Sequence, residues 1–316
     1  MNVWVLADTA AGHANQALGV AEALDRPHLV KRIAYTKLAG LPNLMRGSSL
    51  MGVAKEARQE LTPPWPNLVI AAGRRTAPIA RWIKRQSGGE AKIVQIMHPG
   101  TSAHDFDLIA LPLHDSHPDA ANQLRITGAP HRLTSLKLTA AAQEWEVLLA
   151  HLPRPYLAVL VGGATHKRPF DDAAATLLGQ QVEALRQQSG GSLLVTGSRR
   201  TPHRAWAALT AQLSQPNALF DGHGSDNPYL GFLALADAIV VTGDSVSMAC
   251  EACFTAKPVH IFAPPGFVGD KHARLHQDLY ERGYASPLGG QPHSRPQTPL
   301  DAAGEVAREI SRRFSF

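Results

Sequence analysis

Short runs of apolar residues alternate along the chain with stretches in which apolar residues recur at helical spacing. The apolar runs are residues 3–6, 68–72, 93–97 and 108–111, followed by 157–161, 193–196, 218–220, 238–242 and 259–262. The main helical stretches are 15–24, 51–61, 171–188, 203–213, 228–235, 247–255, 272–282 and 300–314. Such alternation is typical of parallel sheets that helices cover on both faces. The pattern therefore predicts an α/β fold.

The strand and helix pattern falls into two series, which indicates two Rossmann-like domains. Residues 128–155 separate them with turn residues, one helix and a proline-rich exit. We expect an N-terminal domain over residues 1–150 and a C-terminal domain over 151–299. The last helix, within 300–316, is placed to pack back on the first domain.

A short motif occurs once in each half. VIAAGRRTAPIARWIKR lies in the first half and LLVTGSRRTPHRAWAAL in the second. In both, an apolar strand ends at glycine, two arginines follow, threonine is placed to cap the next helix, and proline enters its first turn. The repeat indicates two related domains, with a coincidence of short motifs as the alternative.

Composition narrows the class of protein. The chain has 316 residues, with 31 basic against 26 acidic side chains and a formal charge of +5. This mild excess favours anionic ligands and leaves membrane-surface contact open, but it does not indicate a nucleic-acid-binding tail. Cys250 and Cys253 lie one turn apart on the apolar face of a predicted helix, so we expect them to be buried. Neither a signal peptide nor a membrane span is evident, and we expect a cytoplasmic protein, with peripheral contact with the inner face of a membrane left open.

The stretch VVTGDSVSMACEACFTAKPVHIF predicts a strand, a tight turn, a helix and a second strand. Gly243 lets the chain turn, Ser245 caps the helix, and Val246 and Ser247 present amide donors at its positive end. A helix start of this kind is suited to bind an anion, and Glu251 inside the helix is placed to accept hydrogen bonds from hydroxyl groups. The alternative is an ordinary capped helix with Glu251 in solvent.

The surrounding order of elements, DNPYLGFLALADAIVVTGDSVSMACEACFTAKPVHIFAPP, resembles the donor half of GT-B glycosyltransferases. The peptidoglycan lipid-II N-acetylglucosaminyltransferase family is similar. The resemblance implies two such domains facing across a cleft. It also implies that Ser245, Val246 and Ser247 hold the diphosphate of a sugar nucleotide and that Glu251 holds its ribose. Further candidates that frame the base are Asn227 and Tyr229.

Two other loops of the second half carry candidate donor-binding residues. One follows the strand at 157–161 and holds Gly162, Gly163, Thr165, Lys167 and Arg168; the other holds Ser198, Arg199 and Arg200. Flexible backbone and cations at the end of a strand suit phosphate oxygens, and paired guanidinium groups bind them bidentately. For the first loop the alternative is a solvated basic turn, and for the second it is that at least one of the two arginines points into solvent.

The loop ADTAAGHANQALG supplies candidate catalytic residues in the first half. Transfer with inversion needs a base for the acceptor hydroxyl, and we assign His13 to that role, with Asp8 as base or orienting group. The candidate acceptor-binding residues are Gly12, Asn15, Gln16, Arg74, Arg75, His98 and His114. Capping or packing is the alternative for His13. Histidines also gather at residues 98–117 but without tight ligand spacing, so we expect no metal site.

Seven motifs in order, from GHANQALGVAEAL through AAGRRTAPIA, QIMHPG, FDLIALPLHD, VGGATHKRPF and GSRRTP to VTGDSVSMACEA, are similar to the plant mitochondrial-fission ("elongated mitochondria") family and its bacterial homologues. The combined expectation is sugar transfer from a nucleoside-diphosphate donor to an unknown acceptor, cell-envelope or lipid-linked. It includes no cofactor, nucleic acid or obligate protein partner. Two alternatives stay open: a nucleotide-sugar epimerase, and a non-catalytic protein that binds a nucleotide sugar or a membrane surface.

Overall fold

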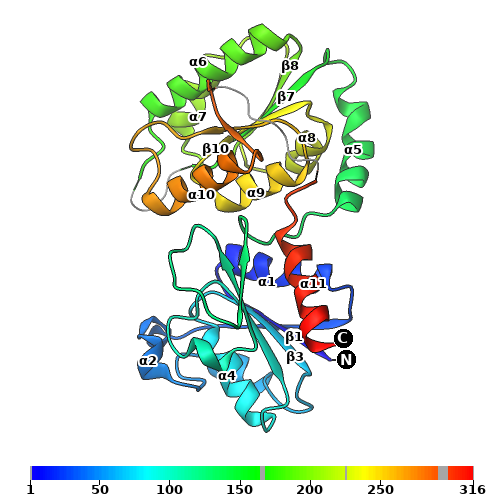
Figure 1. The fold of residues 1–316 in the computed structure, drawn as a ribbon. Coiled ribbons are helices and arrows are strands. Elements are labelled where there is room, and N and C mark those ends of the chain that lie inside the picture. Colours follow the sequence, from blue (N-terminus) through cyan, green and yellow to red (C-terminus); the bar gives the residue numbers. More distant parts are fainter. Residues whose placement is uncertain (1, 164–167, 225, 291–297, 316) are drawn as a thin grey trace. The chain divides into compact units, whose positions relative to one another are not determined.

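The computed structural model describes residues 2–163, 168–224, 226–290 and 298–315. The chain forms two compact units: unit 1 is Met1–Arg132 with Asp301–Phe316, and unit 2 is Leu133–Leu300 (Figure 1). Each unit is built on one six-stranded sheet in which all paired strands are parallel. The predicted α/β fold is confirmed.

Unit 1 has the strand order β2-β1-β3-β4-β5-β6. Its strands are β1 (Val3–Ala7), β2 (His28–Arg32), β3 (Leu68–Ala72), β4 (Lys92–Ile96), β5 (Leu108–Pro112) and β6 (Gln123–Ile126). Its helices are α1 (Ala11–Ala23), η1 (Lys37–Gly40), α2 (Asn43–Arg46), α3 (Lys55–Gln59), α4 (Ala77–Gln86), η2 (Ala103–Asp105) and α11 (Ala302–Phe314).

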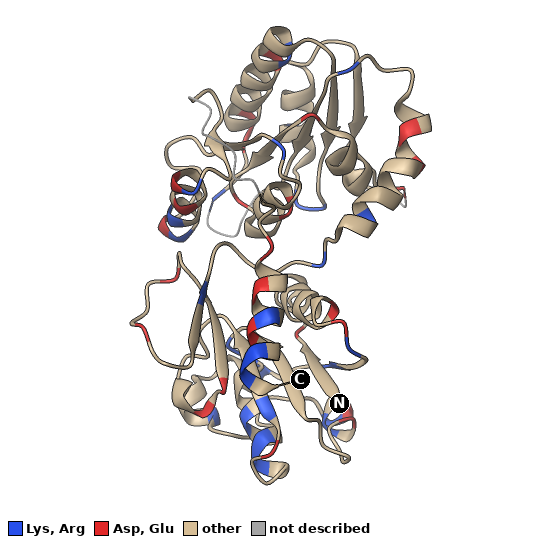
Figure 2. Cartoon of the chain, turned by 45° about the vertical axis from the view of Figure 1, so that its right-hand side comes forward, with Lys and Arg blue, Asp and Glu red and all other residues tan. Residues whose placement is uncertain are grey.

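Alternate residues of each unit 1 strand enter different cores. Val3 and Val5 pack with α1 and α11, whereas Trp4 and Leu6 pack with α3 and α4 on the other face. Figure 1 shows α1 and α11 together on one side of the sheet. Charges of both signs are interspersed along α11 (Figure 2), where Glu309 pairs with Arg312 and Arg313. The last helix thus completes the core of unit 1.

Unit 2 has the strand order β12-β11-β10-β7-β8-β9. Its strands are β7 (Tyr156–Leu160), β8 (Ser192–Thr196), β9 (Asn217–Phe220), β10 (Ala238–Thr242), β11 (Val259–Phe262) and β12 (Ser286–Pro287). Its helices are α5 (Ser135–Leu149), α6 (Asp172–Ser189), α7 (His203–Thr210), α8 (Tyr229–Leu235), α9 (Val246–Phe254) and α10 (Asp270–Glu281).

Helix α5 belongs to unit 2, so the division falls after Arg132 rather than at residue 150. The reason is its packing against α8. Trp145 stacks edge-on against Phe232 at 5.9 Å between ring centroids, and a side chain on Gly231 would collide with the same indole. On the opposite face of the sheet, α6 and α7 pack against β7 and β8 (Figure 1).

The nine predicted strands are all present, with ends shifted by at most one residue. The prediction missed β2, β6 and β12, which have mixed sequences such as HLVKR and QLRI and lie at the sheet edges. It also missed η1, α2 and η2. Cys250 and Cys253 are free and buried, as expected. Among the described residues, no helix combines the length and the apolar character needed to cross a membrane.

The repeated Gly-Arg-Arg-Thr motif differs from its prediction in two ways. Neither threonine caps a helix through its side chain: Thr76 donates to the carbonyl oxygens of Ala72 and Gly73, and Thr201 to those of Val161 and Gly162. The two copies also follow strands that are not equivalent. β3 lies beyond β1 on the side away from β2, whereas β8 is the strand that directly follows β7. The copies therefore do not mark a simple internal duplication.

Candidate functional sites

Each sheet contains one point at which the strand order reverses. In unit 1, β2 and β3 lie on opposite sides of β1, and in unit 2, β8 and β10 lie on opposite sides of β7. The loops that leave such neighbouring strands diverge to opposite faces, which opens a crevice at the carboxyl ends. Predicted site residues follow these strands: Asp8 and Arg75 in unit 1, and Gly163 and Ser245 in unit 2. Each unit thus has a candidate site at its switch point.

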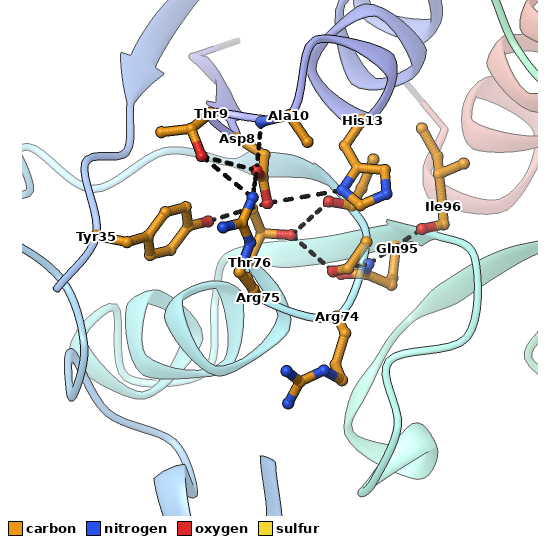
Figure 3. A network of polar contacts seen from close by, with 12 residues as sticks. Asp8, Thr9, Ala10, His13, Tyr35, Arg74, Arg75, Thr76, Gln95 and Ile96 are labelled. Carbon is orange, nitrogen blue, oxygen red and sulfur yellow. Dashed lines mark hydrogen bonds and ion pairs between the residues drawn. The ribbon is translucent and has the colours of Figure 1, made fainter. Parts of the chain in front are cut away.

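The carboxylate of Asp8 is the centre of the unit 1 site (Figure 3). Its Oδ1 accepts hydrogen bonds from the Ala10 amide at 2.7 Å and from the Arg75 guanidinium. The Tyr35 hydroxyl donates to Oδ2 at 3.3 Å, and Arg75 lies over the Tyr35 ring at 4.6 Å. The side chain of Asp8 is fully buried, whereas that of Arg75 is one-third exposed. A fixed anion is therefore surrounded by donors.

These contacts lower the pKa of Asp8 and raise the pKa of Tyr35. Burial by itself would raise the pKa of Asp8, but His13, the Ala10 amide and Arg75 together lower it to about 2. Burial and the neighbouring Asp8 raise the pKa of Tyr35 well above its usual value. Asp8 is ionised at neutral pH and Tyr35 is not.

His13 lies in the first turn of α1 and faces the loop after β3. Its Nδ1 is 3.7 Å from Oδ2 of Asp8, close enough for charge attraction but beyond hydrogen-bond distance. Gly73 has φ +80°, and a Cβ atom there would lie 2.5 Å from the same Nδ1. Only glycine leaves room for the imidazole at this turn. The Gly73 carbonyl accepts from the buried amide of Gln95 at 2.9 Å, which fixes the loop from β4.

The loop after β3 is also held from the segment 40–46, which contains α2. Asn43 donates to the Arg74 carbonyl at 2.8 Å, and Arg46 donates to the Arg75 carbonyl at 3.1 Å. In return Arg74 donates to the Leu41 carbonyl at 2.8 Å. Asn43 and Arg46 are buried, and burial lowers the pKa of Arg46. Arg74 consequently points away from Asp8 (Figure 3), so the two predicted arginines do not act on one anion.

The other predicted acceptor residues are more scattered. Gly12 and Asn15 are exposed on α1, whereas Gln16 is buried with its Oε1 unpaired among the described residues. The His98 ring stacks on His117 at 4.0 Å, and burial lowers its pKa. His114 is buried after β5. Among the described residues, no group of three or more His, Cys, Asp or Glu side chains is arranged to hold a metal ion.

Asp244 is the corresponding centre of the unit 2 site. Its Oδ1 accepts from the Thr242 hydroxyl at 2.7 Å, and its Oδ2 accepts from the Gly163 amide at 3.1 Å. Arg200 reaches the same Oδ2 at 3.0 Å. Asp244 is buried, while Arg200 is about half exposed. The Gly162 amide donates to Thr242 at 2.7 Å, so the amides of this predicted phosphate loop are already bound within the protein.

The start of α9 has the predicted cap. Oγ of Ser245 accepts from the Met248 amide at 3.4 Å. Val246 and Ser247 follow in the first turn, where amides have no carbonyl partner inside the helix. Arg200 adds a cation at the same switch point, while Ser198 donates to the Gly162 carbonyl and shapes the loop. Arg199 is exposed and forms no hydrogen bond or ion pair with the described residues. Together these groups can bind an anion.

Glu251 is held by a tyrosine from α8. The Tyr229 hydroxyl donates to Oε2 of Glu251 at 2.5 Å, and Asn227 accepts from the Tyr229 amide at 3.0 Å. Burial raises the pKa of Glu251, an effect that the Tyr229 hydrogen bond partly opposes. Three of the predicted donor residues thus form one connected group.

The remaining predicted donor residues lie elsewhere or outside the described structure. Arg168 donates to the Gly266 carbonyl, in the loop before α10. Thr165 and Lys167 fall outside the described residues.

Comparison with known proteins identifies the family. The mitochondrial fission ELM1 family matches residues 11–314. The chain is 31% identical over 308 residues to the mitochondrial fission protein ELM1 of Arabidopsis thaliana, covering 87% of this chain and 70% of that protein. It is also 29% identical over 320 residues to uncharacterized protein RP120 of Rickettsia prowazekii, covering 90% of each. The chain belongs to the mitochondrial fission ELM1 family.

Solved structures similar to this ELM1-family chain share its fold. UDP-GlcNAc 2-epimerase from Methanocaldococcus jannaschii has a TM-score of 0.57 at 10% identity, covering 99% of this chain and all of that one. MurG from Acinetobacter baumannii has a TM-score of 0.54 at 14% identity, with the same coverage. The chain therefore has the GT-B-like architecture that its motifs predicted.

Several polar residues of this ELM1-family chain were missed by the sequence interpretation. Asp244 lies within the turn before α9, where only Gly243 and the serines were predicted to act. Tyr35, Asn43 and Arg46 lie in a stretch where no strong motif was visible. A signal did exist for Asp244, because an acidic residue in the turn that follows a buried strand must find hydrogen-bond donors if it is buried there. For Asn43 and Arg46, nothing local indicated that they would be buried.

Proposed function

We propose that this ELM1-family chain transfers a sugar from a nucleoside-diphosphate donor to an acceptor hydroxyl. In this proposal unit 2 binds the donor and unit 1 binds the acceptor. The new bond forms between the acceptor oxygen and the anomeric carbon. The bond from that carbon to the phosphate oxygen breaks, and its electron pair leaves with the nucleoside diphosphate.

The observation that carries the proposal is the group of residues at the unit 2 switch point. The first turn of α9, from Ser245 to Ser247, offers amides and a partial positive charge to a diphosphate. Arg200, held by Asp244 at 3.0 Å, adds a guanidinium that offsets charge on the leaving group. Glu251 lies within the same helix, where its carboxylate can accept from ribose hydroxyls.

In unit 1 we assign the general base to His13 and the orienting role to Asp8. A carboxylate with a pKa of about 2 is a weak base at neutral pH, whereas histidine is the side chain that most often acts as a general base. The acceptor proton would pass to His13, and the adjacent Asp8 anion would stabilise the imidazolium that forms. The low pKa of Asp8 favours His13 over Asp8 as the base, an alternative that the sequence alone left open.

Isothermal titration calorimetry with uridine, guanosine and cytidine diphosphates and their sugar conjugates tests donor binding. We expect one nucleotide to bind, and Glu251→Ala to weaken it by about tenfold or more, since hydrogen bonds to a charged group contribute about 1.5–3 kcal/mol. Glu144→Ala on α5 is the control and should bind as the parent does. If none of the nucleotides binds, the donor site is refuted.

The same protein and nucleotide sugars can also be used to distinguish two rival functions. Fold likeness to UDP-GlcNAc 2-epimerase favours epimerisation without an acceptor as the second candidate. Mass spectrometry of the nucleotide sugar, alone and with candidate acceptors, distinguishes epimerised, hydrolysed and transferred sugar. Binding with none of these products would favour a non-catalytic binding protein, and His13→Ala should then change nothing.

A further inference from the structure

The segment from η1 to α3 exposes large hydrophobic side chains. Leu38 is 53% exposed, Leu44 80%, Met45 64% and Met51 40%. They occupy one compact segment: Thr36 donates to the Gly52 carbonyl at 2.9 Å, and a Cβ on Gly52 would lie 2.5 Å from the Ala39 amide nitrogen. Exposed apolar residues gathered in one short stretch indicate contact with a partner or a membrane.

The same segment, residues 37–59, carries mainly positive charge. Its basic residues are Lys37, Arg46, Lys55 and Arg58, and its one acidic residue is Glu56. Lys37 and Lys55 are exposed at the two ends of the apolar segment, and they form no hydrogen bond or ion pair with the described residues. Their charge is therefore available to an anionic surface.

Hydrogen bonds connect this segment to the unit 1 site. Asn43 and Arg46 bind the carbonyls of Arg74 and Arg75, and Arg74 binds the Leu41 carbonyl in return. Arg75 in turn pairs with Asp8. In Figure 1, α2 lies at the edge of unit 1. A surface that contacts this segment would consequently be held close to the candidate acceptor site.

We propose that Lys37, Leu38, Leu44, Met45, Met51 and Lys55 form a docking surface for an anionic lipid bilayer. Apolar side chains would enter the headgroup boundary while the two lysines meet lipid phosphates. A second copy of the chain fits less well, because two identical basic segments would repel each other. Helix α5 shows the contrast: it also exposes Leu136 and Val147, but it carries Glu144 and Glu146, which an anionic bilayer would repel.

If docking and the proposed sugar transfer both hold, the acceptor bound in unit 1 would be a lipid-linked molecule presented from that bilayer. This statement about the acceptor rests on the proposed function, whereas the docking itself does not. Docking can be measured without nucleotide, so its failure and the failure of donor binding are distinguishable.

Co-sedimentation of the full chain with vesicles tests the docking surface. One set of vesicles contains phosphatidylcholine alone, and the other also contains phosphatidylglycerol. We expect binding to the second set, weakened by salt. Lys37→Glu with Lys55→Glu should reduce the partition coefficient by about 25-fold or more, from about fivefold for each charge lost. Leu44→Ser with Met45→Ser should reduce it by about tenfold. Leu136→Ser with Val147→Ser is the matched control and should bind as the parent does.

Three results would overturn the proposal: no binding of the parent to either set of vesicles, equal loss in the α5 control, or a dimer in light scattering that Leu44→Ser with Met45→Ser dissolves. The last result would assign the surface to a second copy of the chain. Circular dichroism of each variant checks that the fold is intact, which we expect because the substituted side chains are exposed.

Discussion

Arg200 and Asp244 form an ion pair at 3.0 Å that joins the loop after β8 to the loop after β10. Asp244 also accepts from Thr242 and Gly163, so its carboxylate connects three strand ends of unit 2. We expect Asp244→Asn to lower the free energy of unfolding by about 2–3 kcal/mol. The substitution removes the charge that holds Arg200 and places an amide nitrogen where donors already point. Urea unfolding followed by circular dichroism measures the change.

An exposed ion pair in the same unit provides the control. Arg204 lies 2.7 Å from Asp172, but the Arg204 side chain is 88% exposed. Its replacement by alanine should cost less than about 0.5 kcal/mol, because solvent screens such pairs. Equal losses in the two variants would show that Asp244 has no special structural role.

Asp8 should make unit 1 sensitive to acid. Its pKa is lowered from 3.8 to about 2 in the folded state. A lowered carboxyl pKa contributes stability that is complete above the unfolded value and is lost as pH falls through the folded value. The shift corresponds to about 2 kcal/mol at neutral pH, lost between about pH 4 and about pH 2.

Comparison with Asp8→Asn isolates this contribution from all other titrating groups. The parent should exceed the variant in unfolding free energy by at least about 2 kcal/mol at neutral pH. The difference should be about 1 kcal/mol smaller near pH 3. Urea titrations at the two pH values measure it. A difference that does not change with pH would contradict the lowered pKa.

Two glycines of α1 should respond in opposite directions to alanine. A Cβ on Gly19 would lie 2.2 Å from the His131 carbonyl oxygen, whereas one on Gly12 would meet nothing within 4 Å. Gly19→Ala should therefore destabilise by about 1–3 kcal/mol through overpacking. Gly12→Ala should stabilise by about 0.5–1 kcal/mol, since alanine loses less backbone entropy in a helix. Thermal unfolding of both variants checks the pair, and a stabilised Gly19→Ala would refute the close approach.

The central strands could be predicted because burial on both faces leaves a continuous apolar run in the sequence. β7 (Tyr156–Leu160) is buried at every position and was found, whereas β2 contains only half-buried and exposed residues and was missed. The end of unit 1 at Arg132 was not visible either. It depends on which unit α5 packs against, and contacts such as Trp145 on Gly231 leave no local signal.

The site could be predicted where its geometry is local. The turn at Gly243 and the cap at Ser245 lie within a few residues of each other, and both appear in the structure. The partners of Asp8 and Asp244 come from other strands, so they become visible only when strand order is known. The repeated Arg-Arg motif did not indicate which arginine would reach the site. Arg75 and Arg200 each pair with a buried carboxylate, whereas Arg74 donates to the Leu41 carbonyl.

Tyr229 should lower the pKa of Glu251 by donating a hydrogen bond to its carboxylate. Burial raises the pKa of Glu251, and the Tyr229 hydroxyl, 2.5 Å from Oε2, opposes that rise. Tyr229→Phe keeps the ring and removes the donor, so the pKa of Glu251 should rise further. A carboxyl with a raised folded pKa lowers stability as pH rises above its unfolded value of about 4.5, so the variant should lose more stability than the parent as pH rises above that value.

Nucleotide binding should change as well, because a neutral carboxyl accepts hydrogen bonds from ribose hydroxyls less well than a carboxylate does. The affinity of the variant should therefore fall further below that of the parent at mildly acidic pH than at mildly alkaline pH. Unfolding titrations and calorimetry at the two pH values measure both effects. If the affinity falls equally at both, Tyr229 acts through packing alone; if only the unfolding curves shift, Glu251 is buried but does not contact the nucleotide.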